Sequence, residues 1–191
     1  MKRLIALMLC LLMALCILPA QAVTLAGPFT FDLDTFQSYY PMLLQKDVAW
    51  TQQGDCVVGS TEDLPDVQLY MNEAGQVEYM LVQISCPISE AGTATGEEFG
   101  TVLSSAVLSV MLCEVTDPDA VNAGVETFLE ELNDVIDVLN QIDSAKDEEI
   151  KAGLTSYGPL ANHEGCVGVQ VSEDGTMNII FMFAPDGTQF E

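Results

Sequence analysis

Positive charge and histidine are scarce in this chain. Its 191 residues include 5 Lys and Arg and 1 His, against 29 Asp and Glu, so the formal net charge is −24. A surface of this charge is repelled by the phosphates of DNA and RNA and by anionic lipids, which argues against nucleic-acid or electrostatic membrane binding. With a single imidazole and no Cys-x-x-Cys pair, the sequence also lacks the usual ligand spacing of a zinc site. We therefore expect neither a metal nor a cofactor.

Sequence signatures of catalysis are missing as well. There is no Gly-x-Ser-x-Gly nucleophile elbow and no glycine-rich phosphate loop. His163 stands near Glu164 and Cys166, which raises a Cys–His pair as a hypothesis beside the interpretation of a loop histidine next to a structural cysteine. So many carboxylates make accidental pairs inevitable, and paired carboxylates are what a glycosidase-type hydrolase needs. We expect a protein that is not an enzyme, with an exported hydrolase as the alternative.

A long apolar run occurs only at the start of the chain. Lys2 and Arg3 precede 15 apolar residues at 4–18, and Pro19 is followed by the small-residue pattern Ala20-Gln21-Ala22. This layout is typical of a secretory signal peptide, and the run is shorter than the roughly 20 residues that span a bilayer. The sequence predicts cleavage after Ala22 and a secreted or extracytoplasmic protein of the bacterial cell-envelope type, without membrane attachment. The remaining 169 residues carry a net charge of 3 − 29 = −26.

Four cysteines remain after the predicted cleavage, an even number in an exported chain. They are Cys56, Cys86, Cys113 and Cys166. Oxidising compartments favour disulfides, so two bridges are expected, although four cysteines allow three pairings. Pairing neighbours along the chain would give Cys56–Cys86 and Cys113–Cys166.

Two stretches one hundred residues apart share one pattern. "VQLYMNEAGQVEYMLVQIS" at 67–85 and "VGVQVSEDGTMNIIFMFAP" at 167–185 each alternate apolar and polar residues, turn at a glycine, and return through a strand that is apolar on both sides. Gly75 and Gly175 supply the positive φ that a bulged hairpin loop requires. A return strand apolar on both sides is either covered on both faces or lies at an interface.

Helical patterns separate these hairpins. Thr95 and Glu98 have capping-box spacing for a helix over 96–114, and Asp117-Pro118 begins a second helix with an apolar stripe from Val125 to Ile142. We predict one α+β domain at 23–191, with an antiparallel sheet of about five to seven strands and two long helices packed on one face. If the shared pattern reflects a pseudo-duplicated helix–hairpin unit, the domain consists of two half-repeats, 23–91 and 117–191, around the helix at 96–114. The alternative is two independent hairpins in one sheet.

The function expected from these patterns is binding. The leading hypothesis is an exported module that binds a protein or peptide through the sheet face or a strand edge. Its predicted interaction patch consists of Val77, Tyr79, Met177, Ile179 and Phe181. These residues would otherwise belong to the core or to a homodimer interface. A structural or regulatory domain without a ligand of its own is a further alternative.

Overall fold

The computed structural model describes residues 23–87, 93–114, 125, 127, 154–160, 163–172 and 174–190. The elements in chain order are β1 (Val23–Thr24), α2 (Leu33–Leu44), β2 (Ala49–Gln53), β3 (Cys56–Thr61), β4 (Leu64–Met71), β5 (Val77–Pro87), α3 (Thr93–Glu114), β6 (Leu154–Leu160), β7 (His163–Val171), β8 (Thr176–Ala184) and β9 (Gln189–Phe190).

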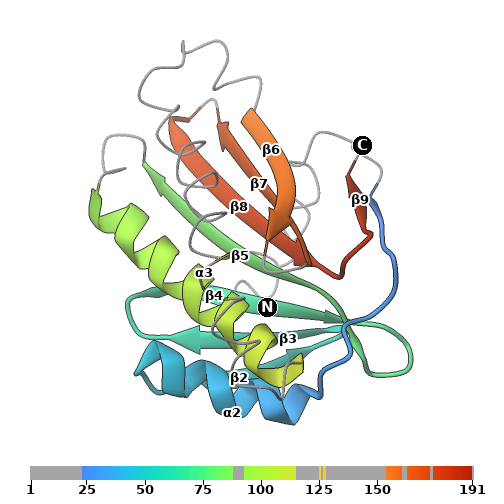
Figure 1. Cartoon of the computed structure of the whole chain (residues 1–191). Helices are drawn as coiled ribbons and strands as arrows, with labels where there is room; N and C mark the ends of the chain where they lie inside the picture. The colour runs from blue at the N-terminus through green and yellow to red at the C-terminus, as the bar shows by residue number, and fades with distance from the viewer. Residues whose placement is uncertain are drawn as a thin grey trace.

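The main sheet has seven strands in the order β2-β3-β4-β5-β8-β7-β6, and every neighbouring pair is antiparallel (Figure 1). β5 and β8 lie side by side at its centre, paired from Met80↔Phe183 to Pro87↔Thr176. The two hairpins therefore belong to one sheet, and their return strands are direct neighbours. This confirms the predicted antiparallel α+β class.

The two hairpin turns are built alike. Gly75 has φ 77° and donates its N–H to the carbonyl of Asn72 at 2.9 Å, while Gly175 has φ 82° and donates to the carbonyl of Ser172 at 3.0 Å. Left-handed backbone of this kind is accessible to glycine without steric cost. The shared pattern in the sequence thus reflects the same turn chemistry at both places.

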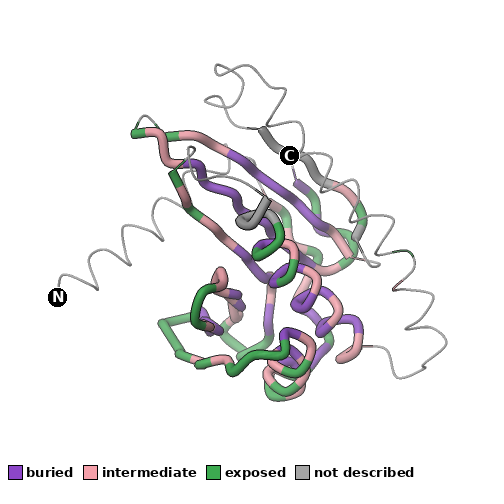
Figure 2. The backbone as a smooth tube through the Cα atoms, turned by 90° about the vertical axis from the view of Figure 1, so that its left-hand side faces the viewer, coloured by how far each residue is buried: buried purple, intermediate pink, exposed green. Residues whose placement is uncertain are grey.

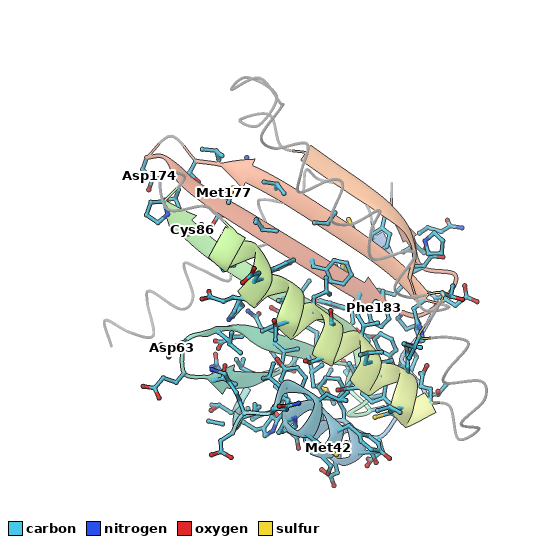
Figure 3. All side chains as sticks on the ribbon, turned by 60° about the vertical axis from the view of Figure 1, so that its left-hand side comes forward. Met42, Asp63, Cys86, Asp174, Met177 and Phe183 are labelled. Carbon is cyan, nitrogen blue, oxygen red and sulfur yellow. The ribbon has the colours of Figure 1, made fainter. Side chains whose placement is uncertain are left out.

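One face of the sheet, which we call the inner face, packs against α3. This helix runs across the sheet, with α2 beside it (Figure 1), and its buried side chains join those of the strands in the main core. Met177 and Phe183, toward opposite ends of β8 (Figure 3), both belong to this core. The residues that α3 contributes to that core are Phe99, Val102, Leu103, Ala106, Val107, Val110 and Met111.

The second long helix, predicted from Asp117 to Ile142, lies outside the described residues apart from Val125 and Thr127, which are both helical. Coverage of one face by two long helices therefore stays a prediction, as do the half-repeats 23–91 and 117–191. The shorter helix α2 begins after Asp32, whose side chain accepts the N–H of Thr35 at 3.2 Å.

The opposite, outer face of the sheet holds a smaller apolar cluster. It consists of Leu81, Cys166, Ile180, Met182, Ala184 and Phe190. β1 and β9 form a two-stranded sheet, and Val23 and Phe190 from this pair pack with the cluster. Ile180 is 1% exposed on the outer side and Phe181 is 0% exposed on the inner side, so β8 is covered on both faces (Figure 2). This explains why the return strand is apolar at consecutive positions.

Candidate functional site: the open edge of β2

The five residues of the predicted interaction patch do not form one surface. Val77, Met177, Ile179 and Phe181 are 1%, 4%, 5% and 0% exposed and lie in the main core. Tyr79 packs with the outer cluster instead, and its ring stacks on Tyr70 at a centroid distance of 4.5 Å. A β-bulge after Tyr70 shifts the register of β5, which is why the alternation does not carry Val77 and Tyr79 to the same face. Four of the five positions thus match the core alternative.

The expected disulfides are absent, and the predicted pairing is wrong. Cys56 and Cys166 lie on the outer face, whereas Cys86 and Cys113 pack toward the inner core, so both predicted bridges would have to pass through the sheet. Three strands lie between those of Cys56 and Cys166, so the two residues are four inter-strand spacings of about 4.8 Å apart, roughly 19 Å, while a disulfide needs Cα atoms within about 7 Å. The order of the cysteines along the chain did not predict their pairing, because strand alternation and strand order decide which side chains meet.

Burial also makes three of these thiols poor nucleophiles. Desolvation raises the pKa of Cys56 and of Cys166 to about 11, and burial together with the nearby Glu114 and Asp32 carboxylates raises that of Cys113 to about 12. Thiolate is the reactive form of cysteine, so these groups are chemically quiet near neutral pH.

His163 has a partner other than the one considered from the sequence. It begins β7 on the inner side, and its Nε2 lies 2.8 Å from Oε2 of Glu114 at the end of α3. The other carboxylate oxygen accepts the N–H and the hydroxyl of Thr30 at 3.1 and 3.0 Å. Burial alone would raise the pKa of Glu114, but the His163 and Thr30 bonds outweigh it and lower that pKa. Cys166 lies on the opposite face of the sheet, so a Cys–His pair is not formed.

This ion pair ties three parts of the chain together. Its side chains are only 11% and 16% exposed, and the imidazole packs against the rings of Phe29 and Phe183 at 5.4 and 5.0 Å. Through Thr30 it also holds the segment that leads into α2. The arrangement serves structure. Within the described residues, no group of three or more His, Cys, Asp and Glu side chains could hold a metal ion.

Among the sheet strands whose burial the structure describes throughout, β2 is the most exposed. In the sheet order β2 is terminal, and four of its five residues are exposed, with Trp50 half-buried. Its sequence, AWTQQ, contains no charge and no proline. Natural edge strands are commonly protected by charge, proline or bulges. The other edge, β6, contains Pro159, but β2 has none of these devices.

The register of the β2–β3 hairpin shows which backbone groups face outward. Gly54, with φ 63°, stands first in the two-residue turn that joins Gln53 to Cys56. Such a turn closes on a hydrogen-bonded pair, and bonded and non-bonded pairs then alternate along an antiparallel ladder. Thr51 therefore bonds β3, whereas Trp50 and Gln52 direct their N–H and C=O groups toward the open edge.

Trp50 holds this edge in place. Its indole ring lies over Gly59 on β3, so closely that a Cβ added at Gly59 would be 2.5 Å from Cζ3 of the ring. The other side of the indole meets the rings of Phe36 and Tyr40 on α2 at centroid distances of 6.2 and 5.9 Å. The edge is thus packed onto α2 before any partner arrives. Trp50 is half-buried and packs against the main core.

A shallow hollow of about 640 Å³ lies beside the beginning of β2, between the end of α2 and the β3–β4 turn. Its lining residues are Pro41, Met42, Gln45, Lys46, Asp47, Thr61, Glu62 and Asp63. Met42 is 60% exposed, and it projects with Asp63 from this part of the fold (Figure 3). Oγ1 of Thr61 is buried and has no hydrogen-bond partner in the described structure.

The sequence analysis did not single out β2 as an edge strand. The sequence feature that could have indicated it was an uncharged stretch in a chain with 29 acidic residues.

Among the described helices, none is both long and apolar enough to cross a bilayer. Comparison with protein-family models, with curated proteins and with solved structures gives no match.

Proposed function

We propose that this chain is an exported, non-enzymatic module that binds a partner protein or peptide by accepting an extended segment as an additional strand on β2. One observation carries the proposal: the β2 edge is exposed, uncharged and free of proline, with the backbone groups of Trp50 and Gln52 directed outward. In strand addition, main-chain hydrogen bonds supply affinity and pockets for alternate side chains supply specificity.

A rigid edge favours this mode of binding. Trp50 is fixed between Gly59 and the rings of α2, so little conformational entropy is lost at β2 when a partner strand pairs. The predicted signal peptide supports a location outside the cytoplasm, where the partner would be another extracytoplasmic polypeptide.

The charge of the chain favours a foreign strand over a second copy. Pairing two β2 edges would bring together two chains of net charge −24. Like-charge repulsion opposes that association, whereas a basic or neutral segment meets no such barrier.

The test uses one position with two substitutions. Both Gln52→Pro and Gln52→Ala lose the side-chain hydrogen bond to the carbonyl of Gly54, but only Gln52→Pro also removes the outward N–H, which an edge strand tolerates. A displayed library of random twelve-residue peptides is selected against the purified chain, and the selected peptides are remeasured by fluorescence anisotropy. We expect Gln52→Ala to bind like the unmodified chain and Gln52→Pro to bind at least about tenfold more weakly, as loss of a backbone bond and steric blocking require.

Hydrogen exchange supplies the matching structural readout. Bound peptide should slow exchange of the Trp50 and Gln52 amides but leave the Thr51 amide, already bonded to β3, little changed. Thermal unfolding should show equal stability for the two variants. Peptides that bind Gln52→Pro with undiminished affinity would refute strand addition at β2.

A further inference from the structure

We infer that the partner strand carries a lysine or arginine whose side chain occupies the hollow beside β2. This inference rests on the proposed function, and it specifies which partner segments the edge selects. Its structural basis is the position of the hollow, its charge and the exposed methionine in its lining.

The hollow lies where an added strand would pass. Asp47 is three residues before Trp50, about 10 Å along an extended chain. A strand bonded to the outward groups of Trp50 and Gln52 and continued past Ala49 therefore reaches the hollow within a few residues. The side chains on one face of that strand are then close enough to enter it.

The electrostatics of the hollow favour a cation. Three carboxylates, from Asp47, Glu62 and Asp63, line it together with one ammonium, from Lys46, which leaves a net charge of 1 − 3 = −2. The end of α2 at Leu44 adds the negative pole of the helix dipole. A glutamate or aspartate on the partner would be repelled.

The remaining features suit a long cationic side chain. Lysine and arginine carry apolar stems that pack on apolar surface while their charged ends reach polar groups, and Met42 provides such a surface at 60% exposure. Both cations are pure donors, and the carboxylates of Asp47, Glu62 and Asp63 in the lining of the hollow supply acceptors. The hollow therefore matches the stem and the head group of the same side chain.

The probe is a ten-residue alternating threonine–valine peptide with a single lysine, placed at each position in turn, and the same series with norleucine or glutamate. Norleucine keeps the length and apolar stem of lysine without the charge. We expect one lysine position to bind about tenfold more tightly than its norleucine counterpart, as several partly exposed ion pairs allow, and the glutamate peptide to bind more weakly still.

Two variants with equal loss of charge distinguish the effect of the carboxylates in the hollow from the effect of the net charge of the protein. The variant Asp47→Asn, Glu62→Gln, Asp63→Asn removes three charges from the hollow, and asparagine tolerates the left-handed backbone at Asp63, φ 66°. The control variant Glu73→Gln, Glu97→Gln, Asp186→Asn removes three exposed charges elsewhere. The lysine preference should vanish in the first variant and persist in the second.

Failure of the inference and failure of the proposed function give different results. Equal binding of lysine and norleucine peptides, with both blocked by Gln52→Pro, would overturn the cation in the hollow and leave strand addition standing. Equal loss of the lysine preference in both charge variants would also overturn it. Binding unaffected by Gln52→Pro, or a dimer of this chain at physiological salt that Gln52→Pro dissociates, would overturn the proposed function itself.

Discussion

Replacing Gly59 by alanine should loosen the β2 edge through a single contact. A Cβ added there would lie 2.5 Å from Cζ3 and 2.8 Å from Cη2 of Trp50, whereas ordinary contacts are 3.4–4 Å. The indole would have to retreat by roughly 1 Å, toward the rings of Phe36 and Tyr40 that pack against it. Overpacking of this kind costs about 1–3 kcal/mol.

The assay is reversible unfolding in urea, followed by circular dichroism and by the emission of the only tryptophan. We expect Gly59→Ala to lower the free energy of unfolding by about 2 kcal/mol, equivalent to a fall in Tm of roughly 4–8 °C for a chain of this size. The emission spectrum of Trp50 should shift as its packing changes.

A double-mutant cycle isolates the contact. In a Trp50→Leu background the clashing ring atoms are gone, so Gly59→Ala should be nearly neutral, or slightly stabilising through the unfolded state. A coupling of at least about 1 kcal/mol is therefore expected. If Gly59→Ala cost the same in both backgrounds, the indole would not be the cause and our account of the rigid edge would be refuted.

Three further outcomes test the rest of the fold. Glu114→Gln should destabilise the protein by about 1–2 kcal/mol at pH 6, because it removes a charge-assisted bond to His163. Since folding lowers the pKa of Glu114, this stabilisation is present above the ordinary carboxyl pKa of about 4.3 and is lost as the pH falls through the lowered value, so urea titrations of the two proteins should differ at pH 6 and converge as the pH falls below about 4.3. Gly175→Ala should cost about 1–2 kcal/mol in thermal unfolding because of its positive φ, whereas Gly100→Ala, on α3 with nothing within 4 Å of the added Cβ, should be neutral or stabilising; equal effects would argue against the turn geometry. The buried thiols of Cys56 and Cys166 should react with a disulfide reagent only at the rate of unfolding, and rapid labelling of either thiol in the native protein would contradict their burial and raised pKa values.

Features governed by local pattern were predictable from the sequence. Gly75 and Gly175 mark the hairpin turns because few other residues adopt a positive φ cheaply, and the apolar spacing from Phe99 to Met111 marks the buried side of α3. The consecutive apolar residues of β8 also correctly implied burial on both faces.

Features that depend on long-range pairing were not predictable in this way. The contact between Glu114 and His163 joins residues 49 positions apart, and nothing in either local sequence specifies it. The adjacency of β5 and β8 likewise arises from sheet order, and the bulge after Tyr70 decides which face Val77 occupies. The predicted patch and disulfides failed for this reason: both required knowing which face each strand residue would meet.

The distribution of charge gives the β2 edge its functional interest. Acidic residues are common at the turns and loops next to β2, among them Asp47, Glu62 and Asp63, yet β2 itself carries none. A charge on the strand would discourage pairing with any partner, while charges beside it discourage only acidic ones. A net charge of −24 then keeps copies of the chain apart without closing the edge. This combination disfavours self-association and leaves the β2 edge available to a basic polypeptide, which is the physical argument for the proposed strand addition.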